Sequence, residues 1–202
     1  MFLSKLDLNP GCQRVRRELS NIYEVHRTIM RAFPDEVEGP GRVLFRIDGC
    51  REECVTVLVQ SSKEPDWSKP VVPIDFFIHH PQTKVFDPVL VKGEQLIFRL
   101  TANPTVKRDG RRWGLVNEEE LRGWIERKAA ESGFSLLSLR VIPHRSVEGE
   151  KNDSVSALKF VSVTYEGTLR IEDTERFHDA LETGIGSGKG FGFGLLSIAQ
   201  LR

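Results

Sequence analysis

Six glycines occupy every second position from Gly184 to Gly194, in the stretch Gly-Ile-Gly-Ser-Gly-Lys-Gly-Phe-Gly-Phe-Gly. Glycine has no Cβ and adopts positive φ freely, so the backbone of such a stretch can approach a ligand closely. Successive N–H groups form concave nests that suit phosphate oxygens, and Lys189 adds a positive charge. The stretch therefore predicts a phosphate-contacting loop, or else a turn that packs a helix tightly against a sheet.

Spacing decides between the glycine motifs that this stretch could represent. A Walker loop needs G-x-x-x-x-G-K-[ST], but Thr183 stands at its first glycine position and Gly190 at its magnesium-binding hydroxyl. No register gives the G-x-G-x-x-G spacing of a dinucleotide fingerprint. Lys189–Phe193 does fit the first five positions of the RNA-recognition signature, from which Gly194 and Leu196 then depart.

Length and composition limit the class of protein. A chain of 202 residues, 39% of them apolar, forms one large domain or two small ones. Its 29 basic and 29 acidic residues cancel, which leaves nucleic acid open as a partner because clustering on one face decides such binding. No apolar run approaches the ~20 residues of a membrane span, and Met1–Pro10 is not typical of a signal peptide. We therefore expect a cytoplasmic protein with no membrane partner.

Cysteine usage favours neither disulfides nor a metal site. The three cysteines are an odd number, which argues against a disulfide framework. Cys50 and Cys54 have no second nearby pair to complete a set of metal ligands. We expect no metal and no cofactor.

Hydrophobic periodicity predicts an alternating order of strands and helices. In the first half a helical pattern runs from Val15 to Phe33 with an interruption near Ser20-Asn21. Strands are expected at Phe2–Leu8, Val43–Asp48, Cys54–Gln60 and Glu94–Ala102, and Phe76–His79 is a weak strand or turn. In the second half helices are expected at Glu118–Ser132 and Asp173–Glu182, and strands at Phe134–Ile142, Ala157–Glu166, Thr168–Glu172 and Leu195–Leu201.

This order is that of the split β-α-β unit, repeated. We expect an α+β fold of tandem ferredoxin-like (RRM-like) βαββαβ domains with a cleft between them, a usual place for a ligand. The expected ranges are 1–105 for an N-terminal domain that carries the site helix, 106–112 for a basic loop or linker, and 113–202 for a C-terminal domain that carries the glycine loop.

A second candidate site lies in the first helical region. Tyr23 and His26 are three residues apart and share a helix face, and Arg27 and Arg31 share another face with Tyr23. Histidine exchanges protons near neutral pH, tyrosine can orient a hydroxyl or a phosphate, and arginine can stabilise extra negative charge on phosphate. RNA supplies its own nucleophile, the 2′-OH, so such a site needs neither metal nor protein nucleophile. The alternative is a surface helix with an ordinary histidine and a partly buried tyrosine.

Three pieces of sequence together resemble one family. They are Tyr23–Arg27 in the first helix, Phe98–Pro104 before the basic loop, and Gly184–Lys189 with Gly192–Ser197 at the end of the chain. They resemble the CasE family, the CRISPR repeat-processing endoribonucleases of type I-E systems. The resemblance covers essentially the whole chain in order, including the opening Met1–Lys5 and the segment Glu64–Trp67.

The resemblance implies tandem ferredoxin-like domains that bind the CRISPR repeat RNA hairpin and cut at its 3′ base without metal. The cut proceeds by 2′-OH attack and leaves a 2′,3′-cyclic phosphate, after which the enzyme stays with the other Cascade subunits. His26 and Tyr23 stand at the family's catalytic positions. Arg31 stands where some relatives carry lysine, which keeps the charge but alters the geometry.

Ten residues are the expected contacts to RNA. They comprise one arginine of the site helix, the basic loop around Asp109-Gly110, one lysine of a predicted strand and part of the glycine loop: Arg27, Lys107, Arg108, Arg111, Arg112, Lys159, Gly186, Ser187, Gly188 and Lys189. The glycine loop is also compatible with a structural role beside the site. Two rival functions remain, a non-catalytic RNA-binding module of two RRM-like folds and a purely structural subunit of a larger complex.

Overall fold

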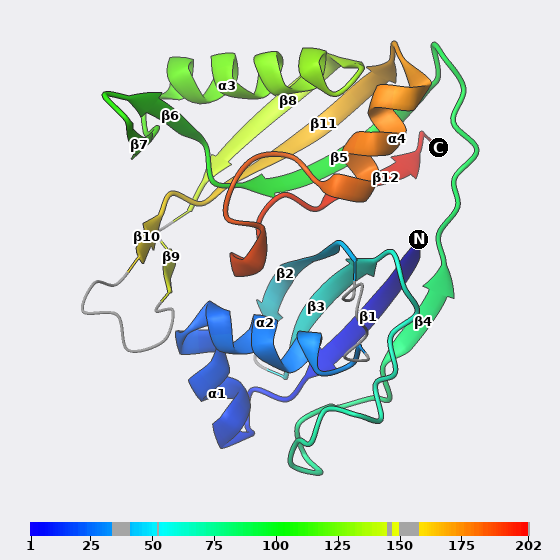
Figure 1. Cartoon of the computed structure of the whole chain (residues 1–202), viewed down its shortest axis with the longest axis vertical. Coiled ribbons are helices and arrows are strands. Elements are labelled where there is room, and N and C mark those ends of the chain that lie inside the picture. Colours follow the sequence, from blue (N-terminus) through cyan, green and yellow to red (C-terminus); the bar gives the residue numbers. More distant parts are fainter. Residues whose placement is uncertain (34–40, 52, 145–146, 150–157, 202) are drawn as a thin grey trace. The chain divides into compact units, whose positions relative to one another are not determined.

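The computed structural model describes residues 1–33, 41–51, 53–144, 147–149 and 158–201 (Figure 1). The chain forms two compact units. The first unit comprises Met1–Asp87, Glu148–Leu158 and Gly190–Gly192, and the second comprises Pro88–Val147, Lys159–Lys189 and Phe193–Arg202. Among the described residues, no helix has both the length and the apolar character needed to cross a membrane.

The first unit is built on a four-stranded antiparallel sheet with the order β2-β3-β1-β4. Its strands are β1 (Phe2–Leu8), β2 (Val43–Arg51), β3 (Cys54–Ser61) and β4 (Gln82–Val85). Alternate residues of β1 and β3 are buried, among them Leu6 opposite Val57, because a half-buried strand shows every second side chain to the core. Two helices, α1 (Gln13–Ser20) and α2 (Ile22–Met30), connect β1 to β2.

Asn21 separates α1 from α2, which confirms the predicted interruption. Its backbone is extended, with φ −131° and ψ 95°, and its side-chain oxygen accepts a hydrogen bond from Tyr23 N at 3.3 Å. Asparagine favours such local bonds over helical ones and is therefore a good N-terminal cap. The cap starts a new helix and places Tyr23 in its first turn.

The fourth strand of this sheet is β4, which the sequence did not predict. All four residues of β4 are exposed, so the strand has no alternation of apolar and polar residues for a pattern to reveal. Of the predicted weak strand or turn at Phe76–His79, only an isolated bridge between Phe77 and Leu8 is strand-like. Residues 62–81, all of them described, hold no helix, so the second helix of the ferredoxin order is replaced by turns and bends.

The second unit has the full βαββαβ order. Its main elements are β5 (Gln95–Ala102), α3 (Glu118–Glu131), β8 (Phe134–Pro143), β11 (Val163–Ile171), α4 (Thr174–Thr183) and β12 (Leu196–Gln200). The sheet order is β12-β5-β11-β8, and the two helices lie over one of its faces (Figure 1). Leu96, Phe98 and Leu100 are buried on that side of β5, while Ile97 and Arg99 are exposed on the other.

Shorter elements complete the second half of the chain. The strands β6 (Thr105–Arg108) and β7 (Arg111–Gly114) form a hairpin between β5 and α3, and β9 (Val147–Gly149) pairs with β10 (Leu158–Phe160). A 3₁₀ turn spans Lys189–Phe191. Of the predicted strand Ala157–Glu166, Ala157 lies outside the described residues, and the strand residues of the remainder belong to β10 and β11. β11 continues through Gly167 to Ile171 with a register shift after Thr168.

The division between the units differs from the expected boundary at residues 106–112. β5 was expected in the N-terminal domain, yet it pairs along its length with β11, from Gln95 opposite Arg170 to Ala102 opposite Val163. The fourth strand of the first sheet is β4 instead. The first continuous stretch of the first unit therefore ends at Asp87, before β5 begins. Periodicity along β5 reports that a strand exists but carries no information on its partners.

Candidate functional site

Helix α2 presents Tyr23 and His26 on one face, as the sequence predicted. The two ring centroids are 5.9 Å apart and the ring planes are inclined by 39°. Both side chains are partly exposed, whereas Ile22, Val25 and Ile29 of the same helix are buried. The apolar stripe therefore docks the helix on the sheet and leaves the Tyr23–His26 pair at its border.

Phe45 of β2 packs against the imidazole of His26. The two rings are stacked, with centroids 6.1 Å apart and planes within 16° of parallel. Phe45 is fully buried, so the histidine ring lies on a rigid apolar surface. This residue was missed in the sequence, where it is one apolar position among several in an ordinary strand pattern.

The segment Gly190–Gly192 also belongs to the first unit and packs on the same rings. The Phe191 ring lies 5.7 Å from the Tyr23 ring, centroid to centroid. A Cβ at Gly190 would lie 3.7 Å from His26 Nε2, and a Cβ at Gly192 would lie 3.3 Å from the Phe45 ring. We call Gly190–Gly192 the loop tip. Its place beside a histidine had no local signal in the sequence, because the contact joins positions far apart in the chain.

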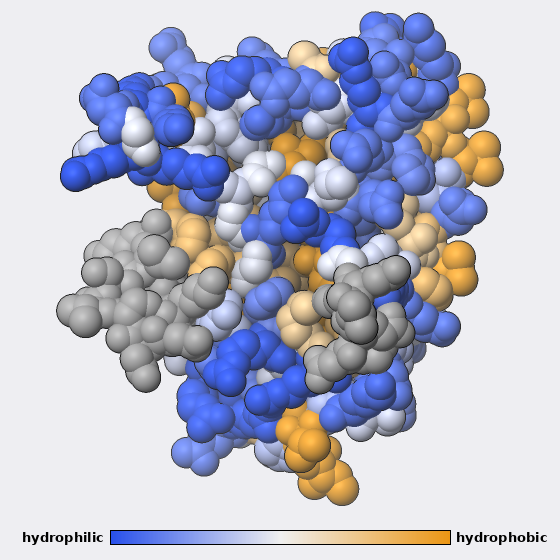
Figure 2. Space-filling view, viewed as in Figure 1, coloured by the Kyte–Doolittle hydropathy of each residue, from blue (hydrophilic) through white to orange (hydrophobic). Residues whose placement is uncertain are grey.

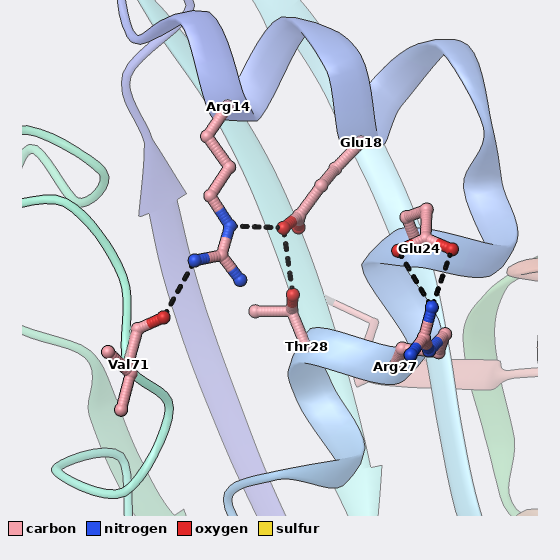
Figure 3. A network of polar contacts seen from close by, with 6 residues as sticks. All are labelled: Arg14, Glu18, Glu24, Arg27, Thr28 and Val71. Atoms are coloured by element: carbon pink, nitrogen blue, oxygen red, sulfur yellow. Dashed lines mark hydrogen bonds and ion pairs between the residues drawn. The ribbon is translucent and has the colours of Figure 1, made fainter.

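A buried carboxylate links α2 to the rest of the first unit (Figure 3). Glu18 of α1, only 3% exposed, accepts hydrogen bonds from Arg14 Nε at 2.8 Å and from Thr28 Oγ1 of α2 at 2.9 Å. Arg14 also donates to Val71 O at 2.7 Å and lies over the Phe76 ring. Buried charges are retained when they are paired and hydrogen-bonded, and here the pairing fixes α2 against α1.

The two arginines of the site helix lie in different settings. Arg27 is half-exposed and donates through Nη1 to both carboxylate oxygens of Glu24, at 3.1 and 3.3 Å (Figure 3). Arg31 follows the last helical residue and is exposed. Within the described ranges, no hydrogen bond or ion pair joins Arg31 to Tyr23 or His26. The catalytic role expected for Arg31 therefore stays a prediction.

The predicted basic loop is a β-hairpin formed by β6 and β7, which we call the basic hairpin. Asp109 and Gly110 form its turn with φ values of 50° and 76°, the backbone that an Asp-Gly two-residue turn favours. Its four basic residues are all exposed, and hydrophilic side chains cover this element at the upper left of Figure 2: Lys107, Arg108, Arg111 and Arg112. Arg108 pairs with Glu120 at 3.2 Å.

The first part of the glycine loop packs inside the second unit. A Cβ at Gly186 would lie 3.1 Å from Trp124, and one at Gly188 would lie 3.0 Å from Phe193. Ser187 Oγ accepts from Asn103 Nδ2 at 3.3 Å, and Lys189 Nζ donates to Thr183 O at 2.6 Å. These contacts give Gly186–Lys189 a structural role at the carbonyl end of α4. Their expected contact with RNA stays a prediction.

The support beneath this part of the loop is aromatic. Trp124 of α3 stacks on Tyr165 of β11, with ring centroids 5.8 Å apart. Burial raises the pKa of the Tyr165 phenol well above its usual range, so the hydroxyl stays protonated and donates to Leu121 O at 3.3 Å. The Trp124–Tyr165 pair therefore has a structural role in packing α3 against the sheet.

Lys159, the remaining expected RNA contact, has its backbone in β10, but its side chain lies outside the described residues.

Cys54 Sγ donates to Asp7 Oδ1 at 3.6 Å. Among the residues that the structure describes, no group of three or more histidine, cysteine or acidic side chains could hold a metal ion.

The fold and the site together define a class of protein. It has two ferredoxin-like units, and the first unit carries a histidine–tyrosine pair on one face of α2. The family model for CRISPR associated protein matches residues 1–200. The chain therefore belongs to the CRISPR-associated protein family that includes Cse3 and CasE.

Two curated relatives and a solved structure match over essentially the whole chain. The CRISPR-associated endoribonuclease Cse3 of Thermus thermophilus is 38% identical over 213 residues, covering 98% of this chain and 100% of that protein. The CRISPR system Cascade subunit CasE of Escherichia coli is 28% identical over 220 residues, covering 100% of both chains. A structure of CRISPR endoribonuclease Cse3 bound to a 19-nucleotide RNA superposes with a TM-score of 0.88 at 37% identity, covering 98% of this chain and 100% of that one.

Proposed function

We propose that this protein is an endoribonuclease that binds the hairpin of a CRISPR repeat in precursor RNA and cuts at its 3′ base. The observation that carries the proposal is the Tyr23–His26 pair on α2, packed on Phe45. This pair lies in a chain that is 38% identical, over nearly its full length, to a CRISPR-associated endoribonuclease. The ordinary alternative, a surface histidine, does not explain why Phe45 and the loop tip pack against the pair.

The proposed reaction is a transesterification within the RNA. The 2′-oxygen attacks the adjacent phosphorus, its proton is removed, and the bond from phosphorus to the 5′-oxygen breaks. The 5′-oxygen leaves with a proton, so the products are a 2′,3′-cyclic phosphate and a 5′-hydroxyl. His26 carries out one of the two proton transfers, because imidazole exchanges protons near neutral pH.

Tyr23 is proposed to orient the reacting groups beside His26. Its hydroxyl can donate to a phosphate oxygen or accept from the 2′-OH. The Tyr23 and His26 rings lie 5.9 Å apart, and we propose that both contact one reacting dinucleotide. Arg31 and Arg27 are proposed to supply positive charge to the phosphate. Arg27 bonds Glu24 through Nη1, and a guanidinium has further N–H donors that can contact phosphate.

Affinity is proposed to come mainly from positive charge on the RNA backbone. The basic hairpin exposes four cations on one small element, and phosphate contacts of this kind dominate the strength of nucleic-acid binding. The remaining expected contacts are Lys159 and the first part of the glycine loop. We further propose that the protein acts in the cytoplasm and keeps its cut RNA as a Cascade subunit. The CasE relative is a Cascade subunit by name.

Incubation with repeat RNA in EDTA tests the proposal. An endoribonuclease of this kind gives one specific cut in EDTA, with a cyclic phosphate end on the 5′ product. Binding without a cut would show a non-catalytic RNA-binding module, and neither binding nor cutting would leave a structural subunit. A shuffled repeat that cannot form the hairpin is the control, and it should remain intact.

A further inference from the structure

We infer that Trp113 of the basic hairpin is a stacking platform for an unpaired base of the bound RNA. The inference rests on the RNA-binding part of the proposed function and not on the cut. The four cations of the hairpin attract any phosphate backbone, and Trp113 adds to them a contact that requires the free face of a base.

Trp113 is the most exposed of the three tryptophans. It is 56% exposed, whereas Trp124 is 2% exposed and stacks on Tyr165. Trp67 donates through Nε1 to Thr83 Oγ1 at 3.1 Å. Within the described part of the chain, the Trp113 indole has no ring, cation or hydrogen-bond partner. A large aromatic surface that dominates the energetics of interfaces is therefore available to a ligand.

The register of the hairpin decides which side chains lie beside the indole. Trp113 is directly opposite Val106, and the next pair on the same side is Arg111 opposite Arg108. Residues that are opposite each other, or two apart along a strand, share one face of the hairpin. The face that carries Trp113 therefore also carries two arginines, and all of these side chains are at least partly exposed.

The other face of the hairpin packs on the second unit at the foot of the two strands. A Cβ at Gly114 would overlap Val161 Cγ2, and Thr105 Oγ1 is hydrogen-bonded to Ser187 Oγ at 3.4 Å. Thr105 and Gly114 are opposite each other, on the face that does not carry Trp113. The support of the hairpin therefore leaves the indole uncovered where the hairpin projects from the second unit (Figure 1).

An exposed indole beside arginines suits nucleic acid better than protein. Proteins bind single-stranded nucleic acid by combining cations along the backbone with aromatic rings on which bases stack, whereas the core of a protein–protein interface is depleted in charge. Bases inside a helix are already stacked on both sides, so Trp113 takes an unpaired base. A hairpin RNA offers such bases in its loop and in the strands that flank it.

Two substitutions of Trp113 separate stacking from apolar contact. Trp113→Leu keeps an apolar side chain and removes the aromatic face, while Trp113→Phe keeps a ring. With a repeat RNA that carries a 2′-deoxy nucleotide at the proposed cut, we expect Trp113→Leu to weaken binding roughly 5- to 100-fold and Trp113→Phe about threefold or less. Val116→Ala, a truncation of a residue that is 78% exposed beside the hairpin, is the control and should keep the wild-type Kd.

The outcomes of this titration are distinct. An unchanged Kd in Trp113→Leu would overturn the inference, and so would equal losses in Trp113→Leu and Trp113→Phe. Thermal midpoints of the variants should stay at the wild-type value, because the side chain that they change is exposed.

Abasic nucleotides identify the base, because they remove bases and keep backbone charge. One RNA carries them in the loop and another in the flanking strands. On the RNA that lacks the stacked base, Trp113→Leu should cost no further affinity, since two groups that act through one contact are not additive. An undiminished effect of Trp113→Leu on both RNAs would overturn the inference.

Tryptophan fluorescence gives a readout that does not depend on affinity. A base stacked on an indole quenches its emission, so saturating RNA should quench the wild-type protein, and most of this quenching should be lost in Trp113→Phe. RNA binding with neither quenching nor dependence on Trp113 would assign the indole to a protein partner. A wild-type protein that binds RNA without cutting it would contradict the proposed catalysis and leave this inference standing, whereas the absence of RNA binding would overturn both.

Discussion

The Thr28 hydroxyl donates to Glu18 Oε1 over 2.9 Å and so ties the helix that carries Tyr23 and His26 to the helix before it. Both residues are buried. Loss of a hydrogen bond to a buried charge costs about 1–3 kcal/mol, so Thr28→Val should lower the free energy of unfolding by that amount in a urea titration. Thr28→Ser keeps the hydroxyl and should lose only the contribution of one methyl group, about 0.8 kcal/mol. Equal stability of Thr28→Val and the wild-type protein would show that the bond does not hold the two helices together.

His26→Ala should abolish cleavage and leave binding of the repeat hairpin nearly unchanged. Proton transfer by a positioned side chain contributes ~10²–10⁴-fold to a rate, while backbone contacts elsewhere carry the affinity. Tyr23→Phe should slow the reaction less, since it removes one hydroxyl and keeps the ring against Phe191. Single-turnover rates and filter-binding constants measure the two quantities separately, with His178→Ala as control. If His26→Ala weakened binding and cleavage equally, His26 would be structural.

Neutralising the basic hairpin should weaken RNA binding and flatten its salt dependence. Removal of each bond to a phosphate should reduce the slope of log Kobs against log salt by about 0.7–0.9. Arg108 is already paired with Glu120, so Arg108→Gln should change the slope less than Arg111→Gln, which removes an exposed charge at the same turn. An unchanged slope after all four substitutions would assign the hairpin to a protein partner or to solvent.

The protein should turn over about once and keep its cut RNA. A cut at the 3′ base leaves the hairpin on the 5′ product, and the proposed contacts fall mostly on that hairpin. Cleavage therefore removes few contacts, and release of product should limit the steady state. With RNA in excess, we expect a burst of about one product per enzyme followed by a slow phase. Linear multiple turnover at physiological salt would point to a general ribonuclease.

Local patterns in the sequence predicted the elements of this fold well. Alternation located β1 and β5. The helical spacing, with its interruption near Ser20-Asn21, located the helical region with Tyr23 and His26 on one face. These features depend on neighbours three or four positions away in the chain, so their physical cause is visible in the sequence itself.

Long-range pairing could not be predicted in the same way. The partners of β5 are β11 and β12. Which of the two sheets β5 joins depends on packing between strands that are far apart in the sequence. Phe45 and the loop tip reach His26 from distant parts of the sequence, and neither carries a pattern that distinguishes a site residue from a core residue or a turn. The sequence therefore yielded the chemical groups of the site but not the residues that hold them.

A single 2′-deoxy substitution at the nucleotide before the scissile phosphate tests the central claim most directly. The proposed reaction takes its nucleophile from the RNA, so removal of one 2′-OH removes the nucleophile and leaves the hairpin and its backbone charge intact. The wild-type protein in EDTA should bind this RNA with an unchanged Kd and fail to cut it, while the all-ribose RNA gives a 2′,3′-cyclic phosphate end. Cleavage of the 2′-deoxy RNA at the same position would contradict the account, because the nucleophile would then be water or a protein group.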